Sequence, residues 1–175
     1  MTEAAPLRTQ QLWIGGQIVA SVLCQVVLFL WLSGRFPGPV ETELAARLAF
    51  GVQWSLVPVL VLLAMILAIA GTRPLFADVI DGNDRADRLA VHIRIQRNTL
   101  EQGMLLIVGL LVFATLARPG ELGAIPALAV MFVVFRLCFW IGYAIRPHFR
   151  TFGFVGTFYP NIALLGTCAY RLWLG

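Results

Sequence analysis

The sequence predicts an all-α membrane protein. Of its 175 residues, 59% are hydrophobic and only 13% are charged, a balance outside the range of soluble domains. Polar segments separate five long apolar stretches: 12–33, 46–70, 97–117, 123–145 and 152–173. A helix of about 20 apolar residues spans the hydrocarbon core of a bilayer, so each stretch is long enough to cross once. A β-barrel is disfavoured because the apolar runs are continuous rather than alternating.

The first stretch, 12–33, is predicted to be a retained helix rather than a cleaved signal peptide. Its apolar run exceeds the about 7–15 residues of a signal-peptide core, and residues 33–36 offer no small-x-small cleavage site. The segment Phe36-Pro37-Gly38-Pro39 then ends this helix. Inside the second stretch, Pro58 predicts a kink.

The distribution of arginine predicts the orientation of the spans. With five spans, the N-terminus and the segments 71–96 and 146–151 share one side, which carries eight arginines against four on the other. The positive-inside rule therefore places the N-terminus in the cytoplasm. All thirteen basic residues are arginine, which agrees with a GC-rich genome, and we expect a multi-pass protein of a bacterial inner membrane. Nucleic acid is excluded as a partner because these arginines are scattered among membrane ends.

A polar cluster stands where the third stretch begins. It has the pattern Arg94-x-Gln96-x-Asn98-x-x-Glu101. Arg94, Asn98 and Glu101 are spaced i, i+4 and i+7 and so share one helix face, whereas Gln96 points elsewhere. Inserting a charged side chain into a bilayer costs at least about 2.5 kcal/mol of free energy, so such residues are found where they pair with another group or serve a function. The cluster therefore predicts a functional site that opens toward the cytoplasm.

Arg136 lies deep in the fourth stretch, about 13 Å from the helix end near Ile145 at 1.5 Å per residue. A charge at that depth requires a partner, and we expect an interhelical pair with Glu101. A structural ion pair that fixes helix register is at least as good an interpretation as a direct catalytic role.

The face of Arg136 continues toward the helix end through Phe139, Trp140 and Tyr143, and then reaches Arg146 and Arg150. Taken alone, a tyrosine there is typical of the interfacial aromatic belt, and the two arginines are typical of cytoplasmic anchors. Together with the Arg94 cluster, however, they place cations, hydrogen-bonding groups and aromatics at one membrane depth. This convergence predicts a site for an anionic, amide-rich ligand.

Metal chemistry is disfavoured. Cys24, Cys138 and Cys168 all lie inside predicted spans and form no metal-ligand pattern. The two histidines, His92 and His148, have no cysteine or carboxylate pattern around them. We expect no metal ion.

These motifs resemble the MAPEG family (membrane-associated proteins in eicosanoid and glutathione metabolism), including its microsomal glutathione transferases. The run from Arg94 to Glu101 resembles the signature at the start of the family's second helix. The run Arg136-x-x-Phe139-x-x-Gly142-Tyr143-x-x-Arg146-x-x-x-Arg150-Thr151 resembles the third helix and the turn after it. Thr72-Arg73-x-x-Phe76-Ala77 resembles the segment after the first helix.

The resemblance implies a four-helix MAPEG-like domain at 46–175 and an N-terminal segment at 1–45 that adds one transmembrane helix without a family counterpart. It also implies a homotrimer with glutathione bound between neighbouring subunits. One subunit would bind glutathione through Arg94, Asn98, Glu101 and Tyr143. The neighbour would contribute Arg73 and Gln96. Arg146 belongs to the same arginine-rich end and is a further candidate ligand.

The implied activity is that of a membrane-embedded glutathione transferase or peroxidase on lipophilic electrophiles or lipid hydroperoxides. Arg150 would lie beside the glutathione sulfur and stabilise the thiolate, with the Thr151 hydroxyl as a second donor. Phe139 stands where some family members have Tyr or His, which removes one polar contact.

Two other classes of function compete with this one. A non-catalytic relative would keep the fold to bind lipid or a partner helix, but it need not retain all five of Arg94, Asn98, Glu101, Tyr143 and Arg150. A small transporter would use the same buried charges, but the sequence lacks the broken-helix and repeat signals of transporters.

Overall fold

A computed structural model describes residues 7–39, 43–72, 87–118 and 120–175, and every element in these ranges is helical. The elements are α1 (Leu7–Ser33), α2 (Leu44–Thr72), α4 (Asp87–Leu116), α5 (Ala124–Ile145), the short 3-10 helix η2 (Pro147–Phe149) and α6 (Arg150–Trp173). The stretch 71–87 contains four aspartates, and the sequence predicts a structured cytoplasmic loop there, but residues 73–86 lie outside the described residues.

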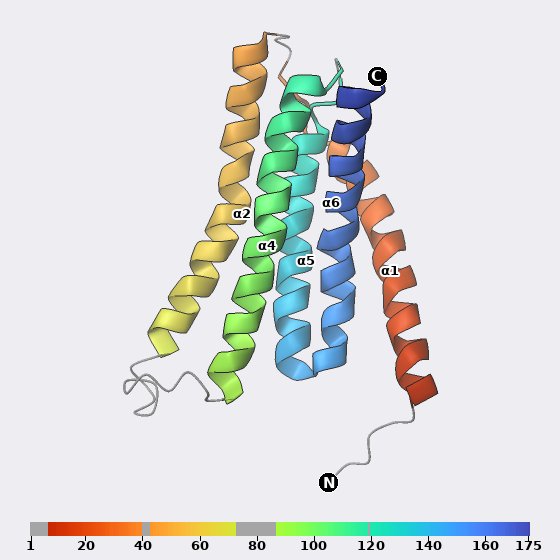
Figure 1. Ribbon diagram of the computed structural model, residues 1–175, viewed down its shortest axis with the longest axis vertical. Helices are drawn as coiled ribbons and strands as arrows, with labels where there is room; N and C mark the ends of the chain where they lie inside the picture. Colours follow the sequence, from red (N-terminus) through yellow and green to blue (C-terminus); the bar gives the residue numbers. More distant parts are fainter. Residues whose placement is uncertain (1–6, 40–42, 73–86, 119) are drawn as a thin grey trace.

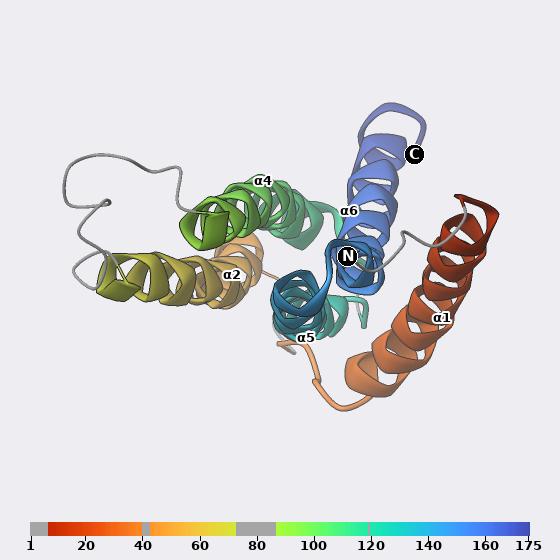
Figure 2. The ribbon, with the colours of Figure 1, turned by 90° about the horizontal axis from the view of Figure 1, so that it is seen from below.

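Helices α2, α4, α5 and α6 form a bundle, and α1 lies against its outside (Figure 1). Seen along the bundle, α1 runs obliquely past α6 and α5, whereas α2 and α4 lie on the other side (Figure 2). The contacts agree, since α1 packs on α6 and α5, and α2 packs mainly on α4. The predicted fold, a four-helix bundle with one extra N-terminal helix, is confirmed.

The part of the chain that is described contains five helices long and apolar enough to cross a membrane. Four of these five helices begin earlier than the predicted apolar stretches, most clearly α4, which starts at Asp87 rather than at residue 97, whereas α5 begins at Ala124, one residue later than predicted. The reason is physical: apolarity marks the depth of lipid, whereas a helix continues past the lipid wherever its backbone bonds remain intact. The Arg94 cluster therefore lies inside a helix, with about two turns preceding it.

Two features of the sequence shape the bundle. Pro58 lies inside α2, where it removes a backbone donor, and the ribbon of α2 changes direction near its middle (Figure 1). On α6, a Cβ at Gly153 would meet the backbone of Phe139, and one at Gly156 would meet the ring of Phe135. These two glycines let α5 and α6 approach closely, as small residues do in membrane interfaces.

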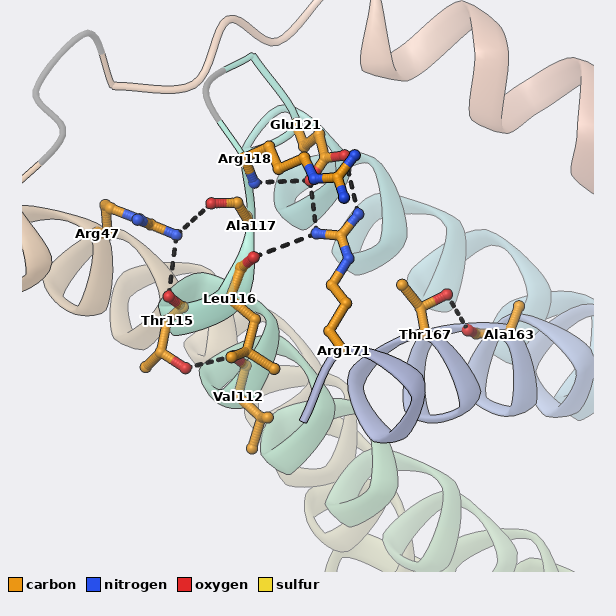
Figure 3. A network of polar contacts seen from close by, with 10 residues as sticks. All are labelled: Arg47, Val112, Thr115, Leu116, Ala117, Arg118, Glu121, Ala163, Thr167 and Arg171. Carbon is orange, nitrogen blue, oxygen red and sulfur yellow. Dashed lines mark hydrogen bonds and ion pairs between the residues drawn. The ribbon is translucent and has the colours of Figure 1, made fainter. Parts of the chain in front are cut away.

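At the end of the bundle away from the Arg94 cluster, Glu121 joins the turn before α5 to the end of α6 (Figure 3). Its carboxylate accepts two hydrogen bonds from Arg171, at 2.6 and 2.9 Å, and one from the backbone N–H of Arg118 at 2.7 Å. Nearby, Arg47 donates to the carbonyl of Ala117 at 2.5 Å. These bonds tie the turn before α5 to the end of α6 and the start of α2. The hydrogen bonds from Arg171 lower the pKa of Glu121 from 4.5 to about 2.

Candidate anion-binding site between three helices

A cavity of about 390 Å³ lies at the end of the bundle where α5 stops and α6 starts. Its lining residues are Arg94 and Asn98 from α4, Phe139 and Tyr143 from α5, and Arg150 and Phe154 from α6. On each helix the two lining residues are four apart, so each helix presents one face to the cavity. The volume falls within the range of small-molecule sites.

The charge of the lining residues is positive. Arg94 and Arg150 supply two guanidinium groups, and no acidic residue is among the described residues that line the cavity. The guanidinium carbon of Arg150 lies 4.9 Å from the ring centroid of Tyr143, within range of a cation–π interaction. Planar guanidinium groups bind carboxylates in a bidentate manner, so the cavity suits an anionic ligand.

A tight turn places Arg150 next to Tyr143. Arg146 has an extended backbone (φ −154°, ψ 141°), as expected for the residue before a proline. The 3-10 helix then reverses the chain, and α6 begins at Arg150. Gly142 makes the turn possible because a Cβ there would lie only 2.6 Å from the carbonyl oxygen of Phe149. The sequence signal for this turn is therefore the pair Gly142 and Pro147.

Beneath the cavity, Arg136 is completely buried. Its Nη1 donates to Oδ1 of Asn98 at 2.7 Å, and its Nη2 donates to Oγ1 of Thr157. The guanidinium carbon also lies 5.5 and 4.8 Å from the ring centroids of Phe132 and Phe139. Its Nε has no hydrogen-bond partner among the described residues. The cation is thus held by neutral oxygens and aromatic faces.

The expected ion pair between Arg136 and Glu101 is wrong. Glu101 lies on the exposed side of α4, where its Oε1 is 3.5 Å from Nε of Arg97. Arg136 instead points toward α6 and toward Asn98, which lies one turn before Glu101 on α4. Spacing along α4 placed Asn98 and Glu101 on one face, but it did not fix which of them α5 approaches.

The other sequence-predicted residues that the structure describes are not among the residues that line this cavity. Gln96 borders a separate small cavity with Ile66, Ile69 and Ala70 of α2, which agrees with the expectation that it points away from Arg94. Arg146 is exposed in the turn after α5, and Glu101 is exposed on α4. The hydroxyl of Thr151 donates to the carbonyl of His148 at 3.1 Å. Arg73 is outside the described residues.

Some residues in and around the cavity were not predicted from the sequence. Phe154 lines the cavity one turn after Arg150. The spacing of four residues would have predicted that the two side chains share one face of α6. Thr157, the second partner of Arg136, follows Phe154 by three residues on the same helix. The indole N–H of Trp140 donates to Nδ1 of His92 at 3.3 Å, which joins α5 to α4 beside the cavity. No motif in the sequence pointed to that contact.

No metal site accompanies this cavity in the described ranges, where no group of three His, Cys, Asp or Glu residues is placed to hold a metal ion. The cysteines are free, and only Cys168 is fully buried.

Fold and site together define a class of protein: a helical membrane protein with a cation-lined cavity at one end of its bundle. The chain belongs to the MAPEG family, whose family model matches residues 51–170. This family comprises membrane proteins of glutathione and eicosanoid metabolism. The match begins within α2, so the whole of α1 lies before it. No curated protein and no solved structure matches the chain.

Proposed function

We propose that the protein is a glutathione transferase or peroxidase that acts on lipophilic electrophiles or lipid hydroperoxides at the membrane. The observation that carries the proposal is the cavity between α4, α5 and α6, which contains two arginines and no acidic residue among its described lining residues. Membership of the MAPEG family supports glutathione as the ligand.

In this proposal Arg94, Asn98 and Tyr143 hold the peptide part of glutathione within one subunit. Arg94 offers a cationic fork for a carboxylate, and Asn98 lies between the cavity and Arg136. Glu101, Arg146, Gln96 and Arg73 complete the site when three subunits assemble. Glu101 and Arg146 extend it from the same subunit, whereas Gln96 and Arg73 reach in from the neighbour. We assign this binding role to residues 46–175, and residues 1–45 form an added segment.

Arg150 is the proposed catalytic residue. A free thiol has a pKa of about 8.5, so at neutral pH most of it is protonated and a poor nucleophile. An adjacent guanidinium favours the thiolate and has no tendency to lose its own proton. In conjugation the thiolate sulfur forms a bond to the electrophilic carbon, the leaving group departs with its electron pair, and the thiol proton is released to water. In hydroperoxide reduction the thiolate sulfur attacks the terminal peroxide oxygen, the O–O bond breaks and the lipid alcohol leaves. A second glutathione thiol then attacks the sulfenic acid so formed, which gives glutathione disulfide and releases water.

The membrane explains the class of second substrate. Lipophilic electrophiles and lipid hydroperoxides partition into the bilayer, and Phe139 and Phe154 give the cavity an apolar wall. We propose that the substrate enters sideways from lipid while glutathione enters from the cytoplasm, with the protein in a bacterial inner membrane.

The direct test is a titration of detergent-purified protein with glutathione, with thiolate absorbance as the readout. We expect saturable formation of thiolate at neutral pH, and turnover when an apolar aryl halide is added. Saturable binding without thiolate, and without turnover of any lipophilic electrophile or hydroperoxide, would favour a non-catalytic role in binding lipid or a partner helix.

A further inference from the structure

Helix α1 packs on α6 and α5, and hydrogen bonds join its polar side chains to α6. It has a largely exposed surface and buries only Ser21, Gln25 and Leu32. Two of these three residues are polar, which is costly in a bilayer unless their hydrogen bonds are made. Gln17, Ser21 and Gln25 are spaced i, i+4 and i+8 and so form one ridge along α1.

This ridge bonds to the first turns of α6. Oε1 of Gln17 accepts the backbone N–H of Phe152 at 3.3 Å, and Oγ of Ser21 donates to the carbonyl of Phe152 at 2.8 Å. Nε2 of Gln25 donates to Ser21 at 3.1 Å and to the carbonyl of Val155 at 3.3 Å. Both backbone groups of Phe152 are therefore held by α1.

The bond from Gln17 supplies something that α6 lacks. The first four N–H groups of a helix have no partner within it, and Phe152 is the third residue of α6. The residue that precedes α6, Phe149, makes no side-chain cap. Nε2 of Gln17 has no partner in the described part of the chain, so the acceptor oxygen is what this side chain contributes. Gln17 thus acts as a cap that comes from another helix.

The capped turn is the one that carries Arg150. The Arg150 side chain is exposed and lies over the Tyr143 ring, so the position of its guanidinium depends on the backbone of this turn. An uncapped helix end frays, and fraying would move Arg150 away from Tyr143.

We propose that Gln17 and Ser21 are positioning residues, through which the added helix α1 fixes the first turn of α6 and sets Arg150 over the cavity. This inference rests on the proposed function, in which Arg150 stabilises the glutathione thiolate. It gives α1 a role in the reaction that the four helices of the bundle do not supply for themselves.

The test compares Gln17→Leu with wild type in the full-length protein. Hydrogen exchange of the segment 150–156 should become faster, because the Phe152 N–H loses its acceptor. The pKa of bound thiol should rise by about 0.5 to 1 unit, which lowers the ratio of thiolate to thiol at a given pH by about three- to tenfold. Affinity for glutathione should stay close to wild type, since Arg94 and Asn98 lie on another helix.

Three further variants test whether the effect comes from the hydrogen bonds of Gln17 and Ser21 or from any change in α1. Gln11→Leu makes the same chemical change at an exposed position of α1 and should leave both readouts at wild-type values. Gln17→Glu keeps an acceptor oxygen and should restore slow exchange of 150–156. Ser21→Ala removes the bond to the Phe152 carbonyl and the bond that Ser21 accepts from Gln25, but it leaves the bond from the Phe152 N–H to Gln17. It should give a smaller shift, which keeps the test informative if Gln17→Leu fails to fold.

Unchanged exchange and unchanged thiol pKa in Gln17→Leu would overturn the inference, as would equal shifts in Gln17→Leu and Gln11→Leu. The two readouts also distinguish this failure from that of the proposed function. If wild type forms no thiolate, the proposed function fails whatever the exchange shows. If wild type forms thiolate and Gln17→Leu matches it, only the positioning role fails.

Discussion

Arg136 donates a hydrogen bond from its Nη1 to Oδ1 of Asn98 over 2.7 Å, and this bond links the buried centre of α5 to the wall of the cavity. Because a guanidinium is only a donor, the oxygen of the Asn98 amide must face it. The amide NH₂ is then available to the cavity. In the proposed site, Asn98 would therefore act as a donor toward a ligand that carries carbonyl or carboxylate oxygens.

Arg136→Leu should lower the affinity for glutathione and have little effect on the unfolding temperature. No carboxylate is left stranded among the described neighbours of Arg136, and replacing a buried charge by an apolar residue is often neutral or stabilising. Without Arg136, however, the Asn98 amide can turn, and loss of one hydrogen bond of about 0.5–1.5 kcal/mol lowers affinity about two- to tenfold. Calorimetric titration and thermal unfolding of the same samples give the two quantities.

Thr157→Val is the matched control for this substitution. It removes the other hydrogen-bond partner of Arg136 and leaves the bond to Asn98 intact. Binding in this variant should stay near the wild-type value. A large fall in the unfolding temperature of Arg136→Leu with normal affinity would assign Arg136 a structural role instead.

Assembly into a homotrimer should be required for tight glutathione binding. The cavity in one chain has no contribution from Gln96, which faces α2 beside Ile66 and Ala70, so a single subunit leaves the proposed site incomplete. Native mass spectrometry in mild detergent should show trimers, with up to one glutathione per subunit. A stable monomer that binds glutathione with the same affinity would contradict this prediction.

The orientation of the helices should be N-terminus in the cytoplasm and C-terminus outside. The described residues include five helices long and apolar enough to span a membrane. An odd number of spans places the two ends on opposite sides, and the positive-inside rule predicts that the side with more arginines is cytoplasmic. Reporter fusions after residue 175 should be active only outside the cytoplasm. A cytoplasmic reporter signal there would refute the five-span topology and the cytoplasmic opening of the cavity.

Much of the fold was predictable because a bilayer leaves few options. Every long apolar run must be a helix, and a spacing of four residues correctly placed Arg94 with Asn98 on one face. The partner of Arg136 was not predictable, because it depends on the rotation of α5 against α4, which no spacing within one helix encodes. The docking of α1 through Gln17 was missed for the same reason, since its partner is a backbone N–H.

Glu121→Gln should destabilise the protein at neutral pH and do so less and less in acid. The pKa of Glu121 is lowered from 4.5 to about 2 in the folded state, first by its hydrogen bonds from Arg171. A lowered folded-state pKa means that the carboxylate stabilises the fold fully above about pH 4.5 and loses this effect as the pH falls toward about 2. The gap in unfolding temperature between wild type and variant should therefore narrow across this window. A gap that is independent of pH would mean that the charge of Glu121 is not what stabilises the turn.

Arg150→Ala should separate thiolate formation from glutathione binding. Arg94, Asn98 and Tyr143 remain in the cavity, so affinity should fall only modestly, whereas the pKa of the bound thiol should rise toward its free value of about 8.5. The rate of conjugation of an apolar aryl halide should then be low at neutral pH and recover as the pH rises, because the glutathione thiol loses its proton to the solvent at higher pH. A pure binding defect would show no such recovery.

Thr151→Val is the companion variant. Its effect on the thiol pKa should be smaller than that of Arg150→Ala, because the wild-type Thr151 hydroxyl already donates to the carbonyl of His148. A wild-type pH–rate profile in Arg150→Ala would transfer the role to another donor, and Tyr143, beneath the Arg150 guanidinium, would be the next residue to replace.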